Sequence, residues 1–112
     1  MPFFDRSQDR RQGLRKAVNL RGLIVAPGLE LRCVIVDLSE GGMKVRLDRG
    51  MALPAEMTIV DLAAGTAQAA TLAWSKGQEA GLRMSGPATA LGGLVSTRFA
   101  PARDAWRRAG GR

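Results

Sequence analysis

The 112-residue chain contains no histidine, no tyrosine and only one cysteine, and each of these absences excludes a class of chemistry. Without histidine there is no Ser-His or Cys-His nucleophile pair and no histidine ligand for a metal. The single cysteine, Cys33, has no partner for a disulfide within the chain, which fits a reducing cytoplasm. A GxxxxGK phosphate-binding loop and a clustered pair of acidic residues are also missing. We therefore expect a binding protein and not an enzyme, with no metal site and no cofactor.

Long hydrophobic runs are missing as well. No apolar stretch approaches the roughly 20 residues needed to cross a bilayer, and residues 1–6 lack the apolar segment of a secretory signal. We therefore expect a cytoplasmic protein that does not contact a membrane. At 112 residues the chain is expected to form one domain with a single core.

The net charge of +7 is distributed unevenly along the chain. Residues 1–21 carry six basic and two acidic side chains, and residues 98–112 carry five basic and one acidic, so each end has a charge of +4. Residues 22–97 carry six basic and seven acidic side chains and are nearly neutral. This asymmetry favours an anionic ligand or partner that meets the ends of the chain, whether nucleotide, nucleic acid or an acidic protein surface.

The pattern of apolar residues predicts a β-rich fold. Six short segments combine apolar and β-branched residues and are separated by turn residues: 17–26, 30–38, 43–47, 56–62, 66–75 and 79–85. Since closing a sheet removes its exposed edges, we expect an all-β fold, a six-stranded antiparallel β-barrel. Residues 86–98 fit no element.

The two ends of the chain are expected to differ from the barrel. Residues 1–16 have almost no apolar periodicity and predict a flexible N-terminal arm, which leaves residues 17–86 for the barrel. Residues 87–112 are expected to form a C-terminal segment with a frayed basic end. Within that segment, Pro101 to Ala109 predicts a short helix. Its apolar side would carry Ala102, Ala105, Trp106 and Ala109.

Three side chains that often take part in chemistry are interpreted as structural. Cys33 lies between apolar strand residues and is expected to be a small buried side chain. Trp106 is expected to pack the short helix on the barrel. Trp74 is expected in the barrel core or as a lid, because it lies two residues from Leu72 on a predicted strand, and not as a platform for a nucleic-acid base.

The segment Asp37-Leu38-Ser39-Glu40-Gly41-Gly42 ends the second predicted strand with polar groups in a pattern typical of a ligand site. Residues two apart on a strand point to the same face, so Asp37 and Ser39 can contact one ligand. The glycine pair allows a sharp turn and close approach of a ligand to the backbone. A carboxylate can also accept hydrogen bonds from N1 and N2 of guanine, groups that adenine does not present.

Arg11 and Arg15 supply the complementary half of the expected site. The guanidinium group is a planar fork of donors that matches phosphate oxygens and also the O6 and N7 edge of guanine. A spacing of four places both arginines on one side of a helical turn, or spreads them along an extended chain, and either arrangement can hold a wide anion. A ligand that combines guanine with phosphate is therefore expected.

Arg-x-x-x-Arg followed by Asp-x-Ser-x-x-Gly resembles the paired signature of the PilZ domain family, which binds cyclic di-GMP. The resemblance covers about residues 10–86 and implies a single-domain member of that family. It implies that Arg11 and Arg15 hold phosphates and guanine O6/N7 edges. It also implies that Asp37 and Ser39 read a guanine edge outside the barrel, next to the turn at Gly41 and Gly42, where Gly42 keeps the surface open. Arg10 would add a contact compatible with two intercalated nucleotides.

The resemblance implies a receptor or adaptor for the bacterial second messenger cyclic di-GMP. It would change its surface on binding, with the N-terminal arm folding across the barrel, and so regulate an unidentified effector protein. One alternative is a small basic barrel that binds nucleic acid, which three Phe, two Trp and a nearly neutral body make less favourable. Another is a barrel that contacts proteins and binds no nucleotide.

Overall fold

The computed structural model describes residues 15–111, which form seven β-strands, a short 3-10 helix and one α-helix. In chain order these are β1 (Lys16–Ala26), β2 (Leu29–Ser39), β3 (Gly42–Leu47), β4 (Glu56–Asp61), β5 (Thr66–Lys76), β6 (Glu79–Met84), β7 (Thr89–Ala90), η1 (Thr97–Phe99) and α2 (Ala100–Arg108). The first six strands match the six predicted segments to within one residue at each end. Most of the predicted arm, including Arg10 and Arg11, lies outside the described residues.

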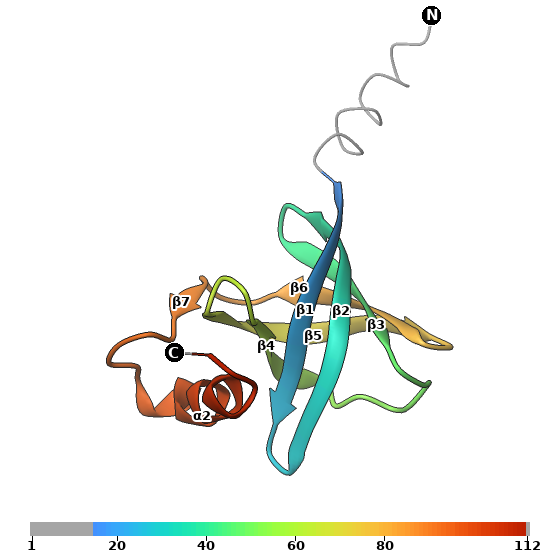
Figure 1. Ribbon diagram of the computed structural model, residues 1–112. Helices are drawn as coiled ribbons and strands as arrows, with labels where there is room; N and C mark the ends of the chain where they lie inside the picture. Colours follow the sequence, from blue (N-terminus) through green and yellow to red (C-terminus); the bar gives the residue numbers. More distant parts are fainter. Residues whose placement is uncertain (1–14, 112) are drawn as a thin grey trace, which may run out of the picture.

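Six of the strands close into an antiparallel barrel (Figure 1). The strand order is β4-β1-β2-β3-β6-β5, and pairing between β4 and β5 completes the circle. The predicted fold is therefore confirmed. β7 was not predicted; it is a two-residue strand within residues 86–98 that pairs with the start of β5.

The barrel interior is filled by side chains that alternate along the strands. Ile24, Ile35 and Val45 are almost completely buried at its centre. Cys33 faces the same interior with 5% of its surface exposed, and burial raises the pKa of its thiol to about 12. The prediction of a small, buried Cys33 is confirmed.

Helix α2 covers the outer face of β1 and β4 and forms a second apolar cluster (Figure 1). Pro101 lies in its first turn, where a missing backbone N–H costs no hydrogen bond. The predicted apolar stripe is confirmed for its buried members Ala102, Ala105 and Trp106. It is wrong for Ala109, which follows the helix and is exposed, because the helix ends at Arg108.

Trp106 fixes this helix to the barrel. Its side chain packs against the apolar outer face of β1 and β4, and its indole Nε1 donates a hydrogen bond of 3.2 Å to the carbonyl of Leu62. The predicted role of Trp106 is confirmed. Among residues 15–111, no helix has the length and apolar character needed to span a lipid bilayer.

Candidate functional site

The turn between β2 and β3 is built from the second half of the sequence motif. Ser39 pairs with Gly42, and the intervening Gly41 has φ +81°, a left-handed conformation that glycine adopts without strain. The Ser39 hydroxyl lies 3.4 Å from the Gly42 carbonyl, which makes a weak hydrogen bond at most. Gly42 itself is the first residue of β3, so Gly41 alone supplies the sharp turn that the sequence predicted for both glycines.

A bulge in β2 turns Asp37 to the outside of the barrel. Ile35 pairs with Val45, but Asp37 pairs with Lys44, so β2 has one more residue than β3 at Val36. Without this extra residue, Asp37 would share the inward face of Ile35, because strand residues two apart point the same way. With it, Asp37 and Ser39 share the outer face, which agrees with the predicted common orientation of these two side chains.

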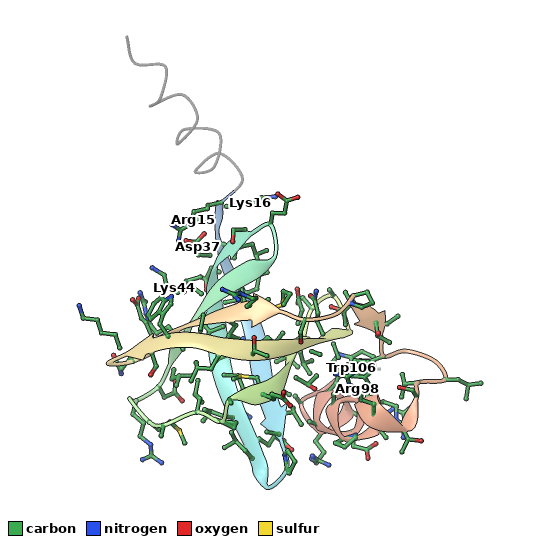
Figure 2. All side chains as sticks on the ribbon, turned by 180° about the vertical axis from the view of Figure 1, so that it is seen from behind. Arg15, Lys16, Asp37, Lys44, Arg98 and Trp106 are labelled. Atoms are coloured by element: carbon green, nitrogen blue, oxygen red, sulfur yellow. The ribbon has the colours of Figure 1, made fainter. Side chains whose placement is uncertain are left out.

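Arg15 reaches this outer face from the start of β1. Lys16 pairs with Leu38, a register that brings Arg15 alongside the end of β2. The Arg15 Nη2 atom donates to Asp37 Oδ2 over 2.9 Å. Figure 2 shows the two side chains meeting at the end of the barrel remote from α2. The arginine side chain is 55% exposed and the aspartate 20%, so water screens the pair and its net contribution to stability is about 0–1 kcal/mol.

A second bulge places Trp74 on the same outer face. Leu72 pairs with Leu82 and Trp74 pairs with Gly81, which leaves Ala73 as the extra residue of β5. Leu72 packs against the barrel core, but Trp74 points outward and is 45% exposed. Trp74 was predicted in the barrel core or as a lid, and the first of these positions is therefore wrong. Its reason, the two-residue spacing from Leu72, fails because the bulge reverses the alternation.

Gly81 provides the space in which the indole of Trp74 lies. A Cβ atom at this position would be 2.1 Å from Trp74 Nε1, so any side chain here would displace the ring. Gly81 is consequently buried although it faces outward. The indole is thus held flat against the barrel surface with one side covered and part of the ring open to solvent.

These residues form one row across four strands. Asp37 on β2 pairs with Lys44 on β3, Lys44 pairs with Gly81 on β6, and Gly81 pairs with Trp74 on β5. A surface cavity of about 160 Å³ lies along this row. Its lining comprises Arg15, Asp37, Ser39, Gly42, Met43, Lys44, Ala73, Trp74, Gly81 and Leu82.

The chemistry of this surface suits an anion that carries an aromatic base. Trp74 offers a stacking face, and Asp37 and Ser39 offer hydrogen-bonding groups at the other end of the row. Arg15 and Lys44 in the lining make the local charge positive in spite of Asp37. Within residues 15–111, no group of three or more acidic or cysteine side chains is placed to hold a metal ion.

The structure brings together part of the predicted site and adds to it. Arg15, Asp37, Ser39 and Gly42 line one cavity, whereas Gly41 lies in the adjoining turn and does not line it. Arg10 and Arg11 lie outside the described residues. Sequence reasoning did not include Lys44 and Trp74, because their place on this surface depends on strand register and on the bulge at Ala73.

Comparison with known proteins identifies the family of the chain. A profile of the PilZ domain matches residues 9–95, which is most of the chain. The chain belongs to the PilZ domain family. Comparison with the sequences of curated proteins gave no match.

Among solved structures, this PilZ domain resembles the Bacillus subtilis inhibitor of motility MotI/DgrA, with a TM-score of 0.54 and 17% sequence identity. The match covers 86% of the present chain and 49% of the Bacillus chain, so the present chain spans about half the length of that protein. At this identity the likeness shows the fold alone. PilZ domains are binding modules of the cyclic di-GMP type and not enzymes.

Proposed function

We propose that this PilZ domain is a cytoplasmic receptor for cyclic di-GMP that acts on a protein partner and catalyses no reaction. The observation that carries the proposal is the convergence of Arg15, Asp37, Ser39 and Trp74 on one outer surface. These residues come from two strands, β2 and β5, and from the segment before β1, and two bulges are needed to bring them to the same face. Family membership supports the choice of ligand.

In the proposed complex, a guanine base stacks on the open part of the Trp74 ring, and Asp37 accepts hydrogen bonds from the N1 and N2 groups of a guanine. Arg15 donates to a phosphate or to the O6/N7 edge of a base. Because Arg15 and Asp37 are joined in the present structure, binding exchanges this exposed ion pair for contacts with the nucleotide. The exchange costs little, since an exposed pair contributes only about 0–1 kcal/mol.

The ligand lies across the surface in this proposal and is not enclosed. A cavity of about 160 Å³ is smaller than the roughly 300–1,000 Å³ of a typical small-molecule site. The rest of a cyclic dinucleotide therefore needs further contacts, which we assign to Arg10 and Arg11 on the sequence motif. Lys44 adds a positive charge beside Asp37 and Trp74, where it favours the phosphates.

Isothermal titration with cyclic di-GMP, run beside cyclic di-AMP, tests the proposal. We expect binding of the guanine compound and at least tenfold weaker binding of the adenine compound. The Arg15→Ala variant should weaken binding roughly tenfold or more, because a hydrogen bond from a charged donor contributes about 1.5–3 kcal/mol. Asp37→Ala should lower affinity and reduce the preference for guanine.

Arg108→Ala is the matched control for Arg15→Ala. Arg108 is similarly exposed and is also ion-paired with a carboxylate of β2, that of Glu30, but at the other end of the strand. Its removal should leave the affinity for cyclic di-GMP unchanged. The proposal is contradicted by equal affinity for the two dinucleotides, or by equal effects of the two arginine variants.

A further inference from the structure

A second surface lies on the outer side of β1 and β2, beside the end of α2. Two adjoining cavities of about 540 and 290 Å³ share Arg21, Leu62 and Ala109. The larger cavity extends to Asn19 and Gly111. The smaller cavity extends across β2, where it is lined by the outward-facing residues Arg32 and Val34. We call this surface the β1–α2 groove and define it by Asn19, Arg21, Arg32, Val34, Leu62 and Ala109. It shares no residue with the cavity at Asp37 and Trp74.

The groove exists because the helix is too short to cover the whole outer face. α2 covers Leu23, Val25 and Val60, and it ends at Arg108. Beyond that end, the outer face of β1 and β2 is open. Val34, an apolar residue at the centre of this open area, is therefore only half-buried.

Arginines flank this apolar floor. In the sheet register Val34 pairs with Arg21 on one side and with Arg46 on the other. Arg46 has an ion-pair partner in Glu79, with a distance of 3.4 Å between them. Among the described residues, Arg21 and Arg32 have no ion-pair partner, and both are exposed. Two cations without an ion-pair partner thus line a groove whose floor is apolar at Val34 and Leu62.

We infer that the β1–α2 groove binds an extended, acidic segment of the effector protein. Carboxylates of that segment would pair with Arg21 and Arg32, whose planar donor forks match a carboxylate. Apolar residues alternating with them would cover Val34 and Leu62. Arg21, Arg32 and Val34 lie on the same outer face of the sheet, so the carboxylates and the apolar side chains of the segment contact neighbouring positions of that face.

The same features disfavour nucleic acid as the occupant. Asp48 also lines the smaller cavity, where its single negative charge stands against the two positive charges of Arg21 and Arg32. No aromatic side chain lines either cavity in the described part of the chain, so bases find no stacking platform there. Charge complementarity with apolar contact therefore favours a peptide.

This inference rests on the proposed function only for the identity of the partner as the effector of the receptor. The groove can be tested without nucleotide, and cyclic di-GMP binding can be tested without peptide. A failure of one proposal is therefore distinguishable from a failure of the other.

The probe is a fluorescein-labelled peptide with three Asp residues alternating with Leu and Val, compared with the same peptide carrying Lys in place of Asp. Fluorescence anisotropy gives the affinities, and amide chemical shifts of the labelled full-length protein locate the contact. We expect the Asp peptide to bind and to shift the amides of Arg21, Val34 and Ala109. The Lys peptide should bind roughly tenfold more weakly or not at all.

The double variant Arg21→Glu/Arg32→Glu should weaken binding of the Asp peptide tenfold or more, because it replaces attraction by repulsion. Lys76→Glu is the control, because Lys76 is an exposed cation at the end of β5 that lines neither cavity. Dispersion of the amide spectrum shows that each variant is folded. A thymidine decanucleotide is titrated in parallel.

The inference is overturned if the Asp peptide does not bind at millimolar concentration, if the Lys peptide binds equally well, or if the double variant retains full affinity. It is also overturned if the oligonucleotide, and not the peptide, shifts the groove residues with a steep dependence on salt. Unchanged binding to Lys76→Glu supports it, and equal loss in that variant contradicts it.

Discussion

The two tryptophans of this domain are supported by the fold in the same way but differ in their exposure to solvent. Each indole lies over a glycine that leaves room for it: Trp74 over Gly81, where a Cβ atom would be 2.1 Å from the ring, and Trp106 over Gly65, where it would be 2.9 Å away. Trp106 is 6% exposed and its Nε1 is bonded to the Leu62 carbonyl. Trp74 is 45% exposed.

The difference lies in what covers the second face of each ring. Trp106, on α2, packs against the outer face of β1 and β4, so its ring contacts other residues of the protein on both faces (Figure 2). Trp74 has one face on Gly81 and an open part beside Arg15 and Lys44. An aromatic ring that the fold supports from below and leaves open above is suited to a ligand, whereas an enclosed ring contributes to stability.

The largest expected effect is on stability. Trp106→Ala should lower the free energy of unfolding by about 3–5 kcal/mol, because a large buried aromatic side chain and its hydrogen bond are removed. Urea unfolding followed by circular dichroism measures this. Trp74→Ala, the matched variant on the exposed side, should change stability by less than about 1 kcal/mol. Equal losses of unfolding free energy in the two variants would contradict the view that only Trp106 contributes to stability.

The next effect is on affinity. Trp74→Ala should weaken cyclic di-GMP binding by roughly 5- to 150-fold, because stacking of a base on an aromatic side chain contributes about 1–3 kcal/mol. Trp74→Phe should restore most of the affinity, since it retains an aromatic face. Calorimetric titration measures both variants. If Trp74→Ala binds as tightly as the original protein, Trp74 is not part of the site.

A pair of glycine variants sharpens the comparison. Gly65→Ala should destabilise the fold by about 1–2 kcal/mol, because Gly65 has φ +68° and its new methyl group would meet Trp106. Gly81→Ala introduces no backbone strain, but it displaces Trp74 and should weaken nucleotide binding by about fivefold. Urea unfolding and calorimetric titration of both variants should show these two losses separately. Reversed results would contradict the assignment of the two rings.

The smallest expected effect is the contribution of Cys33 to the pH dependence of the free energy of unfolding. Its pKa is raised to about 12 from 9.0 by burial, so the folded state keeps the neutral thiol while the unfolded chain ionises. The resulting stabilisation is complete below about pH 9 and is lost as the pH rises from 9 toward 12. Urea unfolding at pH 8 and pH 10 should show this loss, and Cys33→Ala should lack it.

Reaction of Cys33 with a thiol reagent gives a second reading of the same burial. At pH 8 the thiol should react only when the barrel opens, because it is buried and protonated. Trp106→Ala should therefore accelerate the reaction, and Trp74→Ala should leave it unchanged. Equal acceleration in both variants would show that Trp74 also supports the barrel.

Much of the fold follows from local patterns. The strands could be predicted because apolar residues such as Ile24 and Ile35 recur at the spacing of a pleated strand. The helix could be predicted from Pro101 and from the stripe formed by Ala102, Ala105 and Trp106. β7 was not predicted, because two residues carry no periodicity and form a strand only where β5 offers a free edge.

The candidate site was predicted in part. Asp37 and Ser39 share a face because they are two residues apart on one strand, which is a local property. The place of Trp74 was not predictable in this way, because one additional residue, Ala73, reverses the face on which the following side chain lies. The role of Lys44 follows only from its pairing with Asp37 and Gly81.

The number and extent of the main strands, the amphipathic helix and the polar motif at the end of β2 can be read from the sequence, because they depend on residue spacing and turn chemistry. The side of the barrel that each functional group faces is set by the packing of the strands against one another. Bulges at Val36 and Ala73 arise from pairing with neighbouring strands, and they turn Asp37 and Trp74 away from the core and onto one outer face, on either side of β3 and β6. The register of a strand depends on the strands beside it and cannot be predicted from the sequence of that strand alone.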